Sequence, residues 1–389
     1  MKKLGFGLAV FLFATGTFAS VANAADNIVE SPDVKIVIEG QKGTYNDVTI
    51  IANDRTMLPL REVLTNLGVQ NDDQHIIWDA SKKSITVKKD DKTIYLEVGK
   101  KTVNVNGTET AIDVAPIIYP KNNRTYIPAR VVAESLGKQV VWDGTTKSVL
   151  IKDQSSFNEV KEIITKANKA LDDVDKYKVD MGMKMKVSQE DFSMDYDIDM
   201  VSEVDKANKI MHSNVAMNMF GANIETEVYM KDGYSYTKSP IAEGWQIEEM
   251  DAEEFDEMFS TSSDVSSMEP TDVVCAGMVI AESENPDEIV LRGNVMLADF
   301  IDGFNEGLLS SGNEDIAELD MNNFFIEVVY DKNTYMAKST VLQMTANVED
   351  ESGKGQIEIE VGVDVTDVNG DFVIELPQDA VVSGTETAR

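Results

Sequence analysis

Few side chains of this 389-residue chain are arranged for catalysis. The chain has two histidines, His75 and His212, and a single cysteine, Cys275. The histidines lie far apart in the sequence, which argues against a Ser–His or Cys–His nucleophile. No histidine or basic residue close to Cys275 in the sequence would lower the pKa of its thiol. Because the G-x-S-x-G, H-E-x-x-H and P-loop motifs are also missing, we expect a protein that is not an enzyme and holds no cofactor and no metal ion.

Carboxylates are the one abundant reactive group. Asp195, Asp197 and Asp199 alternate with apolar residues, and Asp367 opens part of a Ca²⁺-loop pattern. Both groups offer oxygen ligands that suit Ca²⁺, but the first is typical of the solvated face of a strand and the second of a hairpin turn. An extracellular hydrolase that acts through two carboxylates stays as an alternative. Two facing carboxylates with raised pKa in a cleft would favour it.

Arginines recur in a motif that the chain contains twice. Residues 55–61 read R-T-M-L-P-L-R and residues 124–130 read R-T-Y-I-P-A-R. Each copy continues into a short helical pattern that ends in Leu-Gly, then into a Trp-Asp pair, and the first copy has five extra residues near Asn71–His75. The residues that the two copies share are Arg55, Pro59, Arg61, Gly68, Trp78 and Asp79 in the first and Arg124, Pro128, Arg130, Gly137, Trp142 and Asp143 in the second.

The neighbours of these residues predict the elements that position them. Proline suits the first turn of a helix, apolar residues at i, i+3, i+4 and i+7 follow it, and glycine supplies the left-handed residue that ends the helix. We expect Arg61 and Arg130 to tie each helix start to a strand, through Asp79 and Asp143, and both tryptophans to be core anchors. The alternatives are recognition of an anionic wall polymer by the two arginines and stacking of sugars on the tryptophans.

This pattern resembles the copper amine oxidase N-terminal-like domain, or stalk domain, of secreted proteins from Gram-positive bacteria. The resemblance rests on R-T-Y-I-P-A-R-V-V-A-E-S-L-G followed by V-V-W-D and K-S-V-L-I, and it covers residues 33–153. It implies a compact α+β module of short sheets with one helix per repeat, used as a scaffold or adhesion unit. It implies no copper chemistry, because a copper oxidase site needs several imidazoles.

Charge divides the chain into two unlike parts. Residues 25–154 contain 17 Lys and Arg against 18 Asp and Glu, so nearly all of the net charge of −34 lies beyond Gln154. This step predicts a domain boundary near residues 153–157, and the acidic balance argues against binding nucleic acid or anionic membranes. Residues 1–24 have the charged start, apolar middle and small-residue cleavage site of a signal peptide. We therefore expect a secreted or cell-wall-associated protein, cleaved near Ala24, with no transmembrane segment.

Beyond the charge step, the pattern changes to long alternating strands. A helical pattern starts at Phe157, and alternating apolar residues then predict antiparallel strands with one apolar and one solvated face. The predicted fold class is α+β: the duplicated module precedes an antiparallel curved sheet, a half-barrel, with covering helices over residues 157–380. Further elements expected here are helices at Ala252–Phe259 and Met296–Leu309 and strands at Thr334–Val341, Leu342–Val348 and Phe372–Leu376.

Methionine is concentrated in this second part, where 17 of the 19 methionines lie. Methionine fills irregular apolar space and suits surfaces that adapt to variable ligands, so the strands form either a loosely specified core or a concave face for a lipid-like ligand. The side chains predicted for an apolar ligand face are Met181, Met183, Met185, Met194, Tyr196, Met217, Met219 and Trp245. The order of helix, strand meander, helix insertion and strand meander is similar to the half-barrel of the LolA and LppX lipoprotein-carrier group and to secreted Firmicutes domains of that kind.

Three functional hypotheses follow from these observations. The leading one is a non-enzymatic exported protein of a Gram-positive-type cell envelope, with a stalk-type module and an acidic half-barrel that binds an apolar ligand or a protein partner. A cell-wall polymer or an envelope protein is the expected macromolecular partner. The second hypothesis is a purely structural or interaction protein without a small ligand, and the third is the carboxylate-based hydrolase.

Overall fold

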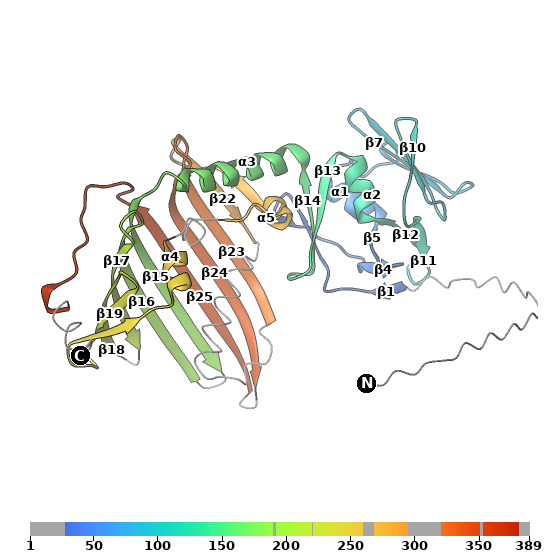
Figure 1. Ribbon diagram of the computed structural model, residues 1–389. Helices are drawn as coiled ribbons and strands as arrows, with labels where there is room; N and C mark the ends of the chain where they lie inside the picture. The colour runs from blue at the N-terminus through green and yellow to red at the C-terminus, as the bar shows by residue number, and fades with distance from the viewer. Residues whose placement is uncertain are drawn as a thin grey trace, which may run out of the picture.

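The computed structural model describes residues 28–189, 192–219, 221–259, 268–294, 320–350 and 353–380. The expected signal peptide and the helix expected at Met296–Leu309 lie outside these described residues. The fold is mostly β: a small module of three sheets precedes one large curved antiparallel sheet (Figure 1). Among the described residues, no helix combines the length and the apolar character needed to cross a membrane.

The two sequence repeats fold as equivalent units of the N-terminal module, residues 28–153. In each repeat a strand ends at proline and leads at once into a seven-residue helix. Gly68 and Gly137 follow these helices with φ of 79° and 82°, which confirms the expected left-handed ends. The equivalent elements are β5 (Arg55–Pro59) and α1 (Leu60–Asn66) in the first repeat and β12 (Arg124–Pro128) and α2 (Ala129–Ser135) in the second.

Three small sheets surround the two helices of the module. Their strand orders are β1-β4-β5-β12-β11, β10-β9-β8-β7-β6 and β13-β14-β2-β3. The strands β5 and β12 pair with each other, so the repeats meet in the first sheet, and both helices bury one face in a shared aliphatic core. The remaining strands of the module are β1 (Ile28–Glu30), β2 (Lys35–Ile38), β3 (Gln41–Lys42), β4 (Ile50–Ala52), β6 (Ile76–Asp79), β7 (Ser84–Lys89), β8 (Lys92–Glu97), β9 (Thr102–Val105), β10 (Thr108–Ala111), β11 (Ile117–Tyr119), β13 (Lys138–Asp143) and β14 (Ser148–Asp153).

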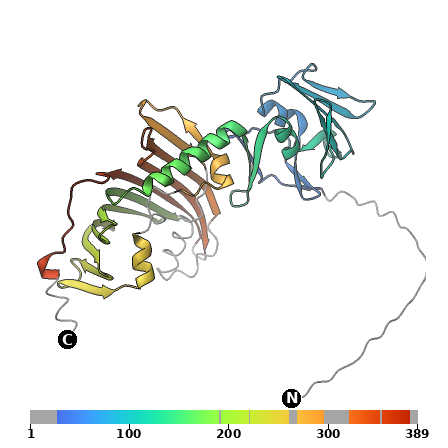
Figure 2. The ribbon, with the colours of Figure 1, turned by 45° about the horizontal axis from the view of Figure 1, so that its top comes forward.

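The large sheet has eleven antiparallel strands in the order β20-β19-β18-β17-β16-β15-β25-β24-β23-β22-β21. Helix α3 (Gln154–Leu171) crosses the concave side of this half-barrel (Figure 2) and buries Val160 and Ile164 against Tyr177 and Val179. The other elements are β15 (Lys176–Gln189), β16 (Phe192–Asp205), β17 (Ile210–Met219), β18 (Ala222–Lys231), β19 (Tyr234–Lys238), β20 (Trp245–Glu249), α4 (Ala252–Met258), α5 (Asp272–Gly277), β21 (Met278–Ala281), β22 (Glu288–Gly293), β23 (Asp320–Asp331), β24 (Ala337–Asp350) and β25 (Gly353–Thr366).

Three of the predicted strands differ from the structure. The expected break between Val341 and Leu342 does not exist, because β24 passes through it in unbroken register with β25. The segment Phe372–Leu376 forms no strand. It lies over the outer face of the sheet, where Ile374 is buried beside Tyr229. An extended segment that covers a sheet buries every second side chain, as a paired strand does. The alternating pattern therefore could not distinguish the two.

The two parts of the chain are joined without a linker. Asp153 is both the last residue of β14 and the N-cap of α3. Helix α5 packs on β13 and β14, where Leu150, Phe157 and Cys275 form a small buried cluster. Beside this cluster, Lys152 is 1% exposed and its Nζ donates a hydrogen bond to the main-chain carbonyl of Met278. Burial lowers the pKa of the Lys152 ammonium group.

This buried lysine makes a pH-dependent contribution to stability. Because its folded-state pKa lies below the unfolded-state value, the unfolded chain binds more protons between the two values, and the free energy of unfolding rises with pH across that window. We expect Lys152→Met, which keeps the stem and removes the charge, to lose this rise. Each pKa unit of depression corresponds to about 1.4 kcal/mol.

Urea denaturation of both proteins from neutral pH to about pH 10.5, the ordinary lysine pKa, measures the effect. The stability of Lys152→Met relative to the wild type should fall as the pH rises from the lowered folded-state pKa of Lys152 toward the ordinary lysine pKa. Substitution of the exposed Lys88 by methionine is the matched control and should leave the pH dependence unchanged. Parallel curves for Lys152→Met and the wild type would contradict the prediction.

Candidate functional site

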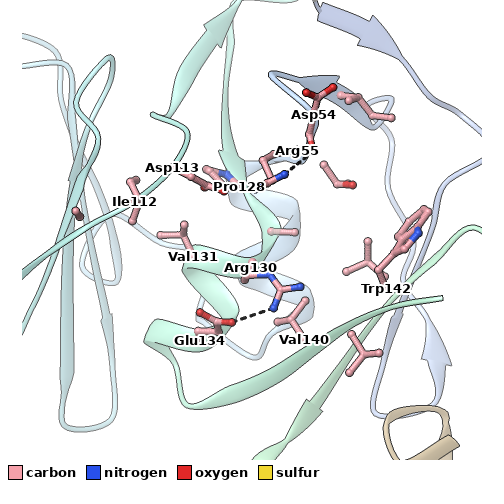
Figure 3. Close-up of a pocket in the computed structure, with 16 residues that line it drawn as sticks. Asp54, Arg55, Ile112, Asp113, Pro128, Arg130, Val131, Glu134, Val140 and Trp142 are labelled. Carbon is pink, nitrogen blue, oxygen red and sulfur yellow. Dashed lines mark hydrogen bonds and ion pairs between the residues drawn. The ribbon is translucent and has the colours of Figure 1, made fainter. Parts of the chain in front are cut away.

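Each repeat of the N-terminal module carries one groove. The repeat-two groove has a cavity volume of about 750 Å³ and is lined by Arg130 and Trp142 from its own repeat and by Arg55 from the other (Figure 3). The repeat-one groove, of about 320 Å³, is lined in the same way by Arg61 and Trp78 from its own repeat and by Arg124 from the other. The exchange of strand arginines follows from the direct pairing of β5 with β12. Sequence reasoning identified these residues but not their meeting in two grooves.

The helix arginines do not contact the aspartates of the Trp-Asp pairs, so the predicted partners are wrong, although Arg61 does reach strand β6 through a main-chain carbonyl. Arg61 instead donates to the side chains of Asn71 and Asp73, at 3.2 and 3.4 Å, and to the carbonyl of Ile76 at 3.5 Å. Arg130 reaches Glu134 on its own helix at 3.3 Å. The difference has a sequence cause, because Asn71 and Asp73 belong to the five-residue insertion that only the first repeat has.

Asp79 and Asp143 stabilise turns instead. Asp79 accepts hydrogen bonds from the main-chain N–H groups of Ser81 and Lys82, and the hydroxyl of Ser81 lowers the pKa of its carboxyl group. Asp143 accepts in the same way from the N–H groups of Thr145 and Thr146. Both aspartates therefore shape the hairpin after the tryptophan, which leaves the helix arginines facing the grooves.

The tryptophans of the repeats are exposed, so the prediction of core anchors is also wrong. Trp78 and Trp142 are 39% and 46% exposed. Each stands two residues after a buried residue, Ile76 or Val140, and therefore on the same face of its strand. The core ends before the tryptophan position, so the indole lies at the edge of the groove. A strand pattern indicates the face of a residue but not whether the core extends that far.

The charges of the repeat-two groove are mixed. Arg55 forms an ion pair with Asp113 and donates to the main-chain carbonyl of Asp54 at 3.0 Å. Burial raises the pKa of the Asp113 carboxyl group, but the hydrogen bond and charge of Arg55 outweigh burial, so this pKa is lowered. Glu134 and Asp54 add two further carboxylates to the lining. Anionic and cationic hydrogen-bonding groups thus stand side by side around an aliphatic floor.

The concave face of the half-barrel is the second candidate site. Met181, Met183 and Met185 on β15 are half-buried and pack against the core under the helices. Cross-strand register places Tyr196 opposite Met185 on this face. It also brings Met194, opposite Val187, and Met217, opposite Ile198, to the same face. Met219 pairs with Tyr196, and its side chain lies outside the described residues.

Trp245 does not share this face. It pairs with Lys238, which pairs with Glu227, and this row of residues belongs to the outer side of the sheet. There the indole is 7% exposed and meets the Tyr229 ring edge-on, with centroids 5.8 Å apart, beneath the segment that contains Ile374. Its inclusion in the predicted ligand face is therefore wrong. The segment that covers it is far away in the sequence, so local pattern could not reveal it.

The carboxylates show no metal or hydrolase geometry in the part of the chain that the structure describes. Asp195, Asp197 and Asp199 are exposed on the outer face, and no group of three His, Cys, Asp or Glu residues there could hold a metal ion. Where the pKa of a described carboxyl group is shifted, it is lowered. The raised pair that would favour a hydrolase is not found among these residues.

Comparison with protein families assigns most of the chain. The model of a family of unknown function, DUF6612, matches residues 159–384, which is more than half of the chain. The chain belongs to the DUF6612 family. In this DUF6612 protein, residues 37–151 also match the copper amine oxidase N-terminal domain, which confirms the resemblance carried by the repeats. A comparison with curated proteins finds no match.

Solved structures similar to this DUF6612 protein cover its second part. LprF from Mycobacterium bovis is 12% identical, with a TM-score of 0.33 over 57% of this chain and 97% of LprF. The lipoprotein LppX from Mycobacterium tuberculosis is 11% identical, with a TM-score of 0.29 over 56% of this chain and 99% of LppX. A DUF1329 family protein from Desulfovibrio piger is 10% identical, with a TM-score of 0.20 over 57% of this chain and 95% of that one.

The positions of the three tryptophans predict unequal effects on stability. Trp78→Ala and Trp142→Ala remove half-exposed rings, and each should lower the free energy of unfolding by less than about 1 kcal/mol. Trp245→Ala leaves a cavity under the covering segment and should cost about 3–5 kcal/mol. Urea denaturation followed by circular dichroism measures all three variants. A loss above about 3 kcal/mol for Trp78→Ala or Trp142→Ala would restore the core-anchor interpretation.

Proposed function

We propose that this DUF6612 protein is a non-catalytic exported binding protein of the cell envelope, whose half-barrel holds a lipid-like ligand on its concave face. The observation that carries the proposal is the continuation of apolar surface beyond the helices. Under α3, Tyr177 and Val179 are buried, at 7% and 3% exposure. Further along β15, Met181, Met183 and Met185 keep the same face but are only half-buried. That part of the face still exposes apolar surface that a ligand could bury.

The side chains of this region suit a ligand of variable shape. Methionine is unbranched and polarisable, so a row of methionines can adjust to different acyl chains at small cost in strain. Met185 and Tyr196 stand opposite each other, which places an amphipathic ring among the flexible side chains. A core that serves stability alone favours β-branched and leucine side chains with fewer rotamers.

The outer face limits the ligand chemistry. Asp195, Asp197 and Asp199 are exposed there, and the second part of the chain carries nearly all of the net charge of −34. A field of this sign repels anionic head groups. We therefore infer a ligand with an apolar body and a neutral or cationic head. The N-terminal module, which contacts the half-barrel through Lys152, would hold the half-barrel in a defined orientation at the envelope.

A neutral apolar fluorophore, N-phenyl-1-naphthylamine, tests the concave face directly. Its fluorescence should rise when it binds the wild-type protein. The double variant Met183→Gln, Met185→Gln keeps the side-chain length but adds polar amides, and it should bind at least about tenfold more weakly, equivalent to about 1.4 kcal/mol. The measurement is a fluorescence titration of the full chain.

Val201→Gln is the matched control. Val201 lies on the neighbouring strand β16, is 47% exposed, and belongs to the outer face, opposite Asp180. This variant should bind the fluorophore as the wild type does. An equal loss in Val201→Gln and the methionine variant, or no fluorescence rise with the wild type, would overturn the proposal in favour of a purely structural half-barrel.

A further inference from the structure

The repeat-two groove contains an aromatic ring that the fold leaves uncovered. Trp142 is 46% exposed, although burying a large apolar side chain contributes about 1.5–3 kcal/mol. Gly144 follows it closely, and a Cβ at that position would lie 3.6 Å from the indole Nε1. A side chain at this position would therefore touch the nitrogen edge of the ring, which glycine leaves uncovered. The flat face of an indole is a platform for the C–H face of a sugar ring, whose axial hydrogens form an apolar surface.

Planar hydrogen-bonding groups stand in the same groove. Arg130 uses Nη1 for Glu134, and in the described part of the chain its Nε and Nη2 have no protein partner. Its side chain is 59% exposed. Guanidinium and carboxylate groups present paired donors or acceptors in one plane, which matches the spacing of two neighbouring hydroxyls. Arg55 and Asp113 offer a second such pair at the groove.

The charge of the groove selects among polymers. Its lining holds two arginines, Arg55 and Arg130, against three carboxylates, Asp54, Asp113 and Glu134. A polyanion such as nucleic acid or a phosphate polymer would meet net negative charge, which disfavours it. The recognition of an anionic wall polymer by the repeat arginines is therefore the weaker alternative for this groove. A neutral, hydroxyl-rich chain uses donors and acceptors of both kinds.

The first repeat supports the same conclusion by contrast. Its groove is less than half as large. The insertion residues Asn71 and Asp73 accept hydrogen bonds from the guanidinium of Arg61. The Arg61 side chain is correspondingly less exposed, at 41% against 59% for Arg130. The second repeat lacks the insertion, so its arginine and its tryptophan both face an open groove.

We propose that the repeat-two groove is a saccharide-binding site for a neutral glycan chain. One sugar ring stacks on Trp142, and its hydroxyls bind Arg130 and Glu134, while Arg55 and Asp113 hold the neighbouring sugar. The cavity of about 750 Å³ has the size of ordinary ligand pockets. This site is separate from the concave face of the half-barrel, so it stands or falls independently of the proposed lipid-like ligand.

Isothermal titration calorimetry of the full chain tests the site. The probes are the hexamers of β-1,4-linked N-acetylglucosamine and of β-1,4-linked glucose, with polyglycerol phosphate as the anionic polymer and decaproline as the peptide. The wild type should bind at least one neutral hexamer, and more tightly than the phosphate polymer or the peptide. Trp142→Ala should weaken that binding at least about tenfold, the equivalent of 1.4 kcal/mol.

Three further variants separate binding from folding. Trp142→Phe keeps an aromatic face and should retain most of the affinity that Trp142→Ala loses. Trp78→Ala, the equivalent change in the smaller groove, should change the affinity less than about threefold, or 0.7 kcal/mol. Ile241→Ala, at a side chain 83% exposed on the half-barrel, should have no effect. The proposal is overturned if neither neutral hexamer binds, if Trp142→Ala binds as the wild type does, or if polyglycerol phosphate or decaproline binds best.

Discussion

Lys152 lies at the point where the last strand of the module becomes the first helix of the half-barrel, and the arrangement of both parts depends on how it is buried. Among the described residues, its ammonium group donates a hydrogen bond to the carbonyl of Met278, at the start of β21. Close packing surrounds that contact: a Cβ at Gly40 would lie 2.6 Å from Cγ1 of Val279. A charge buried in this way costs free energy unless its partner stays in place. The joint therefore holds α5 and β21 against the module.

Duplication and insertion together account for the two grooves. Pairing of β5 with β12 brings a strand arginine of each repeat to the groove of the other, so neither groove exists in a single repeat. The insertion then makes the two sites unequal, because it supplies Asn71 and Asp73 to Arg61, whereas in the described part of the chain Arg130 is bonded to Glu134 alone. The two repeats therefore share one architecture, but the guanidinium of Arg61 is bonded to the insertion and that of Arg130 is not. The difference arises from five residues of loop.

The half-barrel separates its chemistry by face. The concave side collects methionines and the packed helices, while the outer side carries exposed aspartates and, at one end, the covering segment over Trp245. His212 stacks on Tyr229 on that outer side, with ring centroids 4.3 Å apart, and its Nε2 lies 3.2 Å from Glu227. Polar and aromatic contacts therefore cover one end of the outer face, while unbranched methionine side chains line the concave face. This division would suit the binding role proposed above, because the charged side chains and the flexible apolar side chains lie on opposite faces of the sheet.

The amino-acid sequence alone determined the repeats, both helix starts at proline and their left-handed glycine ends, because these depend on local backbone preferences. It also determined the alternation of β15 and β16, since period-two patterns report which face a residue takes. Only the tertiary structure decided that Trp78 and Trp142 are exposed, that Trp245 is buried on the outer face, and that Phe372–Leu376 covers rather than pairs. The physical reason is the same in each case. Exposure depends on where the core ends and which distant segment lies above a residue, and neither is encoded within a few positions of that residue.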